Sequence, residues 1–110
     1  MYAVAILRYR RPLDEVVTVQ DAHRAYTARL KAEGTLVASG PCVPRTAGVL
    51  LLRVPDEGHL AALDRVRDED PYTRAGMVQY EILPWAPTTG LADLDRAAGA
   101  PGPGAGVPTA

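Results

Sequence analysis

Residues 48–54, with the sequence GVLLLRV, form the most hydrophobic stretch of the chain. Apolar side chains occupy consecutive positions in it, so a strand built from this segment is apolar on both faces. Residues 2–9, YAVAILRY, have the same character, and residues 10–12, RRP, end that segment. Each of these two predicted strands therefore requires apolar cover on both sides.

The segment after residues 2–9 has the signals of one helix. Asp14 and Glu15 place negative charge where a helix begins, and Gly34 stands where a helix ends, so about 20 residues between them are predicted to be helical. Arg24, Arg29 and Lys31 are predicted to point away from its buried stripe. The stripe itself consists of Val16, Val19, His23, Tyr26 and Leu30.

The next segment favours a wide hairpin that leads into residues 48–54. Thr35 to Ser39 is predicted to be a short strand, closed by Gly40 and Pro41. A loop through Pro44 and Arg45 then connects it to the hydrophobic strand.

A second helix and a fourth strand complete the pattern. Asp56 is predicted to cap the helix, which runs until Asp70 and Pro71 stop or kink it. Its apolar positions are Leu60, Leu63 and Val66. Residues 76–83 then alternate as a strand, ended by Pro84.

The resulting order, β-α-β-β-α-β, predicts a ferredoxin-like α+β fold with one four-stranded antiparallel sheet and both helices on the same face. Two helices cover only one face of the sheet, although two strands are apolar on both. The economical cover for the other face is a second copy of the chain. The sequence therefore predicts a homodimer, a dimeric α/β barrel with a barrel-like interior between the subunits.

The composition changes near the end of the chain. From Arg96 to Ala110 nearly all residues are Ala, Gly or Pro, which offer little side-chain burial to offset chain entropy. Residues 1–87 are therefore predicted to be the folded domain, and residues 88–110 a largely disordered tail.

Composition also excludes several function classes. With 12 basic and 13 acidic residues in 110, a nucleic-acid-binding surface is not expected. No apolar run approaches the roughly 20 residues that span a bilayer, and Met1 is not followed by a basic leader, so we expect a cytoplasmic protein without a membrane partner. Cys42, His23 and His59 are too few for a Cys/His zinc site, so neither a metal nor a cofactor is expected.

Five short motifs follow one another along the chain: Met1–Val4, Tyr9–Leu13, Ala22–Arg24, Gly34 with Leu36–Pro41, and Asp70–Tyr72 followed by Ala75–Gly76. Together they resemble the YciI-like (YCII-related) family. The resemblance covers about residues 1–87 and implies a dimeric α+β barrel fold with a histidine–aspartate pair as the active site. Motif matching places that pair at His23 and Asp70.

Both residues of that pair have a structural alternative. A histidine on an apolar helical stripe is often a core residue satisfied by a backbone carbonyl, whereas a catalytic His23 would act as general base or acid. Asp70 before Pro71 has the pattern of a helix N-cap. The two roles of Asp70 are compatible, because one oxygen can cap the helix while the other faces His23.

Six further residues are candidate substrate-binding residues. Ser39 and Gly40 end a strand where backbone can approach a ligand, although a tight turn also explains them. Arg45 can hold a carboxylate, or it is a solvated loop arginine. Tyr72 packs beside Asp70 or lines the pocket. Arg8 and Tyr9 point to opposite faces of their strand, so one of the two should approach the interior.

These residues lead to a hypothesis of function. We expect a small cofactor-independent enzyme, a lyase, isomerase or cyclase, in which His23 transfers protons on an activated aromatic, lactone or polyketide-like substrate and Asp70 orients it. The substrate is expected in a cleft between the first helix and the sheet. The alternatives are a non-catalytic small-molecule-binding module and an accessory subunit of a larger enzyme.

Overall fold

The computed structural model describes residues 1–99. Its elements follow in the order β1 (Tyr2–Tyr9), α1 (Leu13–Val16), a 3-10 turn η1 (Val17–Val19), α2 (Gln20–Ala32), β2 (Leu36–Pro41), β3 (Ala47–Arg53), α3 (His59–Glu69), α4 (Pro71–Arg74), β4 (Val78–Trp85) and α5 (Leu91–Ala98).

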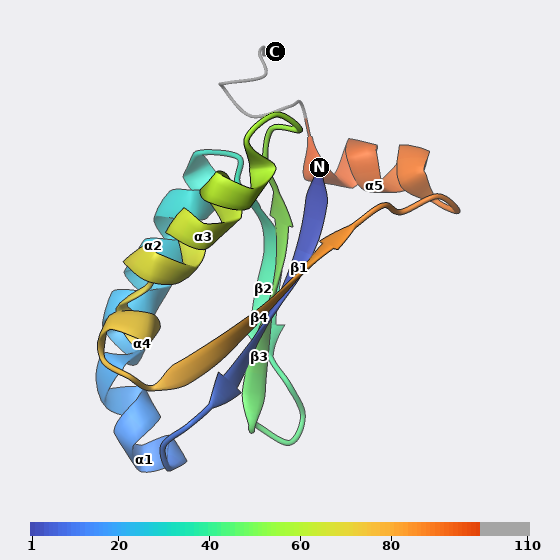
Figure 1. The fold of residues 1–110 in the computed structure, drawn as a ribbon. Helices are drawn as coiled ribbons and strands as arrows, with labels where there is room; N and C mark the ends of the chain where they lie inside the picture. The colour runs from blue at the N-terminus through green and yellow to red at the C-terminus, as the bar shows by residue number, and fades with distance from the viewer. Residues whose placement is uncertain (100–110) are drawn as a thin grey trace.

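The four strands form one antiparallel sheet in the order β2-β3-β1-β4. Helices α2, α3 and α4 cover one face, while only α5 lies near the other (Figure 1). This is the predicted ferredoxin-like α+β arrangement, and the prediction of the fold class is confirmed. The two central strands, β1 and β3, are the two stretches that the sequence marked as apolar on both faces.

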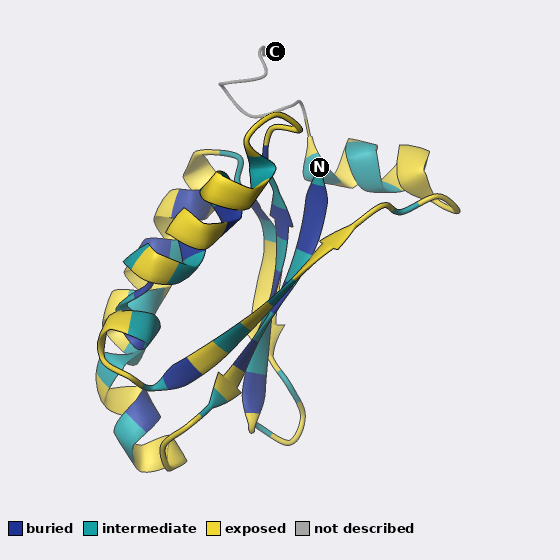
Figure 2. Ribbon diagram, in the orientation of Figure 1, coloured by how far each residue is buried: buried dark blue, intermediate teal, exposed yellow. Residues whose placement is uncertain are grey.

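The core lies between this sheet and the helices. On β1 the odd-numbered residues Ala3, Ala5 and Leu7 are almost completely buried, opposite Leu52 and Leu50 of β3 and with the helices above them. Helices α2 and α3 turn their buried residues to the sheet and their exposed residues to solvent (Figure 2). The alternation along β1 therefore leaves Val4 and Ile6 on the uncovered face.

The first predicted helix is present, but it is divided. Residues 13–32 are helical throughout, with the 3-10 turn η1 between α1 and α2. Gly34 ends the segment with a φ of 83°, and the amide of Thr35 donates to the carbonyl of Leu30 at 2.9 Å. This is the left-handed glycine cap expected at a helix C-terminus.

The prediction of an Asp56 cap is wrong. The N-cap of α3 is Gly58, and exposed Asp56 instead accepts a hydrogen bond from the amino terminus of Met1 at 2.6 Å. The helix begins two residues later than a cap at Asp56 implies. Of its three apolar positions Leu60, Leu63 and Val66, the last two are buried and Leu60 is 62% exposed.

The fourth strand does not stop at Pro84 but continues to Trp85. It is an edge strand, paired with β1 alone, with Pro84 opposite Ala3. An edge strand tolerates a residue without an N–H group, because alternate amides face away from its neighbour.

Within residues 88–110, the segment predicted to be a largely disordered tail, Leu91–Ala98 form the helix α5. Asp95 of this helix accepts a hydrogen bond from the hydroxyl of Tyr2 at 2.6 Å and lies 3.5 Å from the guanidinium of Arg53. Both partners belong to the central strands, so contacts with the sheet stabilise a helix of only eight residues, which is marginal by itself. The part of the prediction that concerns residues 100–110 lies outside the described residues.

Candidate active site

His23 stands on the face of α2 that is turned toward the sheet and α4. Its side chain is 15% exposed, and its ring stacks on Tyr72 with centroids 4.1 Å apart and an interplanar angle of 18°. Stacking on one side and packing on the helix restrict the rotation of the imidazole. The ring therefore presents its edge, with the two nitrogens, in a defined direction.

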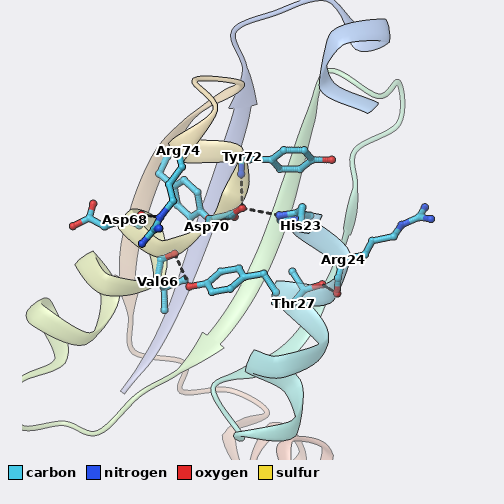
Figure 3. Close-up of polar contacts among 10 residues, drawn as sticks. His23, Arg24, Thr27, Val66, Asp68, Asp70, Tyr72 and Arg74 are labelled. Atoms are coloured by element: carbon cyan, nitrogen blue, oxygen red, sulfur yellow. Dashed lines mark hydrogen bonds and ion pairs between the residues drawn. The ribbon is translucent and has the colours of Figure 1, made fainter. Parts of the chain in front are cut away.

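Asp70 occupies the junction between α3 and α4 and is completely buried. Its Oδ1 accepts a hydrogen bond from the amide of Tyr72 at 2.9 Å and lies 2.9 Å from Nδ1 of His23 (Figure 3). The carboxylate thus caps α4 and contacts the imidazole at the same time. Both contacts are therefore present, but the prediction that one oxygen caps the helix while the other faces His23 is wrong, because Oδ1 makes both contacts.

Tyr80 of β4 satisfies the second oxygen of that carboxylate. Its hydroxyl donates a hydrogen bond to Oδ2 of Asp70. Burial, followed by the negative charge of Asp70, raises the pKa of Tyr80 far above its ordinary value. The phenol therefore stays protonated at neutral pH, so that it remains a donor to the buried carboxylate.

A cavity of about 260 Å³ opens beside His23, between α2 and the sheet. It is lined by His23 and by five of the predicted substrate-binding residues: Tyr9, Ser39, Gly40, Arg45 and Tyr72. This is the place where the cleft was expected, below the first helix and near the end of β2. Asp70 does not line the cavity. It contacts His23, which does.

Arg45 projects into this cavity from the β2–β3 loop. Its Nε donates to the hydroxyl of Tyr9 at 3.0 Å and its Nη2 to Oε1 of Gln20 at 2.6 Å. The bond to Tyr9 raises the pKa of the guanidinium. Burial raises the pKa of the Tyr72 phenol in the same wall. Arg45 is thus a positioned charge rather than a freely solvated loop residue.

Arg8 is not part of the cavity lining, which corrects the prediction for this residue. Its side chain is exposed and pairs with Glu81 of β4 at 3.0 Å. Because successive residues of a strand point to opposite faces, Tyr9 reaches the cavity and Arg8 cannot.

The helix also contributes residues that sequence reasoning missed. Gln20, Arg24 and Thr27 line the cavity together with His23. Positions separated by three, four and seven residues share one helical face, so this spacing was a usable signal. Tyr80 was missed as well, because nothing local to β4 indicates a contact with Asp70.

The remaining reactive side chains lie elsewhere. Nδ1 of His59 lies 3.0 Å from the backbone carbonyl oxygen of Asp56. Neither His59 nor Cys42 lines the cavity. Within residues 1–99, no three His, Cys, Asp or Glu side chains form a group suited to a metal ion. Over the same residues, none of the helices has both the length and the apolar character that crossing a membrane requires.

Comparison with known proteins places the chain in a family. The family model described as YCII-related domain matches residues 2–86. The solved structure of 5-chloro-2-hydroxyhydroquinone dehydrochlorinase from Burkholderia phenoliruptrix, in complex with 2,5-dihydroxybenzoquinone, superposes with a TM-score of 0.60 at 22% sequence identity. That alignment covers 79% of this chain and 96% of the other.

Among curated proteins, no sequence matches the chain. The likeness to the dehydrochlorinase shows a shared fold, and it agrees with the ferredoxin-like α+β class predicted from the order of elements. The family match extends over most of the chain, from the first residue of β1 to the residue after β4. The chain belongs to the family of YCII-related domain proteins.

Proposed function

We propose that the protein is a small acid–base enzyme in which His23 moves a proton to or from the carbon or oxygen of a bound organic molecule. The observation that carries this proposal is the position of His23 on the cavity wall with its Nδ1 2.9 Å from a completely buried carboxylate. A histidine held by a carboxylate is suited to general acid–base catalysis near neutral pH, without a cofactor.

Asp70 would set the tautomer of that histidine. An ionised carboxylate only accepts hydrogen bonds, so the neutral imidazole carries its proton on Nδ1 and leaves Nε2 as the base. Nδ1 is the only nitrogen of His23 with a hydrogen-bond partner among residues 1–99. When Nε2 takes up a proton, the negative charge of Asp70 stabilises the imidazolium.

The size of the cavity narrows the substrate class. A cavity of about 150 Å³ is large enough for benzene, and the space beside His23 is about 260 Å³. The space therefore has room for a single substituted ring, which is compatible with the aromatic and lactone substrates expected from the sequence. The fold neighbour was solved with a single-ring quinone, which supports the same size class.

The proposed reaction class is a lyase, isomerase or cyclase step that begins with proton transfer. His23 Nε2 removes a proton from the substrate and the electron pair remains on the substrate, either to form a new double bond or to expel a leaving group. Ser39 and Gly40 stand on the same wall, at the end of β2, where a hydroxyl can hydrogen-bond the substrate.

We further propose that the active form is a homodimer built on the uncovered sheet face. Val4 and Ile6 of β1 lie on this face, and Leu83 and Trp85 at its β4 edge are 45% and 44% exposed. A contiguous apolar face of this kind marks an interaction surface. A second copy would supply a matching face about a two-fold axis.

The test combines substitutions with a reaction that needs no knowledge of the natural substrate. Single-ring phenols, quinols and unsaturated lactones are incubated with the protein in D₂O, and deuterium incorporation at carbon is followed by NMR. His23→Ala should abolish the acceleration, and Asp70→Asn should reduce it on the order of 10²-fold, because an amide cannot stabilise the imidazolium. His59→Ala is the matched histidine control and should leave the rate unchanged.

Stability is measured on the same variants by urea unfolding. A purely structural role predicts a loss of about 1–3 kcal/mol for His23→Ala with the activity per folded molecule preserved. That outcome would contradict the proposal. Binding of a ring compound without any turnover, unchanged by Asp70→Asn, would instead indicate the non-catalytic binding module.

A further inference from the structure

The cavity beside His23 carries positive charge without an acidic counterpart. Arg24 and Arg45 both belong to its lining, and within residues 1–99 no Asp or Glu side chain does. The chain as a whole has a formal net charge of −1, so the cavity wall departs in sign from the rest of the molecule. Such a concentration of one sign in a concave, partly desolvated site attracts the opposite charge.

Arg45 is held in place by neutral groups alone. The hydroxyl of Tyr9 and the amide oxygen of Gln20 accept its hydrogen bonds, and its guanidinium lies 5.9 Å from the centre of the Tyr9 ring. In the described part of the chain, no carboxylate lies within ion-pair distance of Arg45, whereas Arg53, for example, pairs with Asp95. These contacts orient the guanidinium but leave its charge uncompensated.

Arg24 adds a second positive charge at the mouth of the cavity. It follows His23 directly in α2, and its side chain extends away from Asp70, on the far side of the imidazole (Figure 3). Among residues 1–99, the carboxylate in direct contact with His23 is that of Asp70, behind the wall, while the side of the ring that a ligand approaches is cationic.

We infer that the ligand of this cavity is an organic anion with a single ring, a carboxylate or an ionised phenol or enol, whose charged oxygen binds Arg45. This inference rests on the proposed function in one respect, that the cavity is the substrate site. Arg45 presents a planar fork of N–H donors suited to such oxygens. With the oxygen on Arg45, the ring lies beside Tyr9 and Tyr72 and within the same cavity as His23.

The experiment measures binding, not turnover, on the full chain. The probes are 4-hydroxybenzoate and its neutral counterpart 4-hydroxybenzamide, titrated at pH 7 and followed by calorimetry and by amide NMR shifts of the cavity residues. The benzoate should bind at least about tenfold more tightly, the scale of one hydrogen bond to a charged partner. Raising NaCl from about 20 to about 200 mM should reduce that preference.

Substitutions test which residue causes the tighter binding of 4-hydroxybenzoate. Arg45→Gln should remove it, Arg24→Gln should weaken it less, and the control Arg65→Gln, on an exposed residue of α3 outside this cavity, should retain it. Equal binding of the two probes, a preference that survives Arg45→Gln, or no shifts at the cavity with either probe would each overturn the inference. His23→Gln separates the two proposals, because it should abolish proton transfer while keeping the preference for the anion.

Discussion

Asp70 is the residue on which the candidate site depends. A carboxylate that is 0% exposed is costly unless its oxygens are bonded, and here the amide of Tyr72, the imidazole of His23 and the hydroxyl of Tyr80 all contact it. Its two oxygens therefore serve different purposes. Oδ1 links the end of α3, the start of α4 and the imidazole, while Oδ2 depends on a single donor from β4.

Removing the Tyr80 hydroxyl, which donates to Oδ2 of Asp70, gives a prediction at the scale of single residues. Tyr80→Phe should lower the free energy of unfolding by about 1–3 kcal/mol, because a buried carboxylate oxygen loses its only side-chain partner. It should also change the ¹⁵N shift of Nδ1 of His23, since Asp70 is then held less firmly. Urea unfolding and imidazole NMR are the measurements.

Tyr26→Phe is the matched control for this change. The Tyr26 hydroxyl is also buried, but it donates to the backbone carbonyl of Val66 at 2.8 Å and does not contact Asp70. Tyr26→Phe should lower the free energy of unfolding by a similar amount and leave the ¹⁵N shift of His23 Nδ1 unchanged. A His23 signal that responds equally to both substitutions would show that Tyr80 has no particular role in positioning Asp70.

At the scale of elements, α5 shows how a short helix is stabilised by contacts with a sheet. Gly90 precedes it in the left-handed conformation, with a φ of 85°, and Gly99 follows it. An eight-residue helix is marginal by itself in water. Asp95 connects it to Tyr2 of β1 and Arg53 of β3, and Arg53 also donates to the carbonyl of Gly99 at 3.3 Å.

A prediction follows for that attachment. Asp95→Ala should lower the free energy of unfolding by about 1 kcal/mol, because the nearly buried hydroxyl of Tyr2 loses its acceptor and Arg53 loses its ion pair. Asp93→Ala is the matched control on the same helix. Asp93 is exposed and pairs only with Arg96 one turn later, so its loss should change stability by less than about 0.5 kcal/mol. Equal effects in urea unfolding would show that α5 is not stabilised by the sheet.

At the scale of the whole molecule, the sheet is covered unequally. Helices lie over one face, and the opposite face keeps partly exposed apolar residues: Val4 and Ile6 of β1, Val49 and Leu51 of β3, and Leu83 and Trp85 of β4. Helix α5 covers the end near Tyr2 and leaves the middle of that face open (Figure 1). The asymmetry is a property of the fold, because two crossover helices in this topology pack on the same side.

The proposed dimer gives the prediction at this scale. Light scattering should report twice the chain mass of 11.7 kDa at micromolar concentration, and an interface of about 800 Å² per chain is the size that a stable dimer needs. Ile6→Glu, in the middle of the uncovered face, should give a monomer. Leu60→Glu, on the exposed side of α3, should remain dimeric. A wild-type chain that scatters as 11.7 kDa would refute the dimer.

The sequence by itself determined the fold class and the main candidate residues. Period-two and helical patterns identify the four strands and both long helices, because the burial of apolar side chains depends on these two periods. The same patterns put His23 on the inner side of α2, and the Asp-Pro pair marks Asp70 as a helix cap. Errors arose where local signals competed, as with Asp56, whose capping pattern was replaced by an ion pair with Met1.

Only the tertiary structure decided which side chains meet. The contacts of Asp70 with His23 and Tyr80, and of Arg45 with Gln20, join residues from different elements. The choice of Tyr9 over Arg8 for the cavity depends on which sheet face the helices cover. Local sequence specifies periodicity and caps, whereas contacts between distant residues depend on packing between elements, which no local pattern encodes.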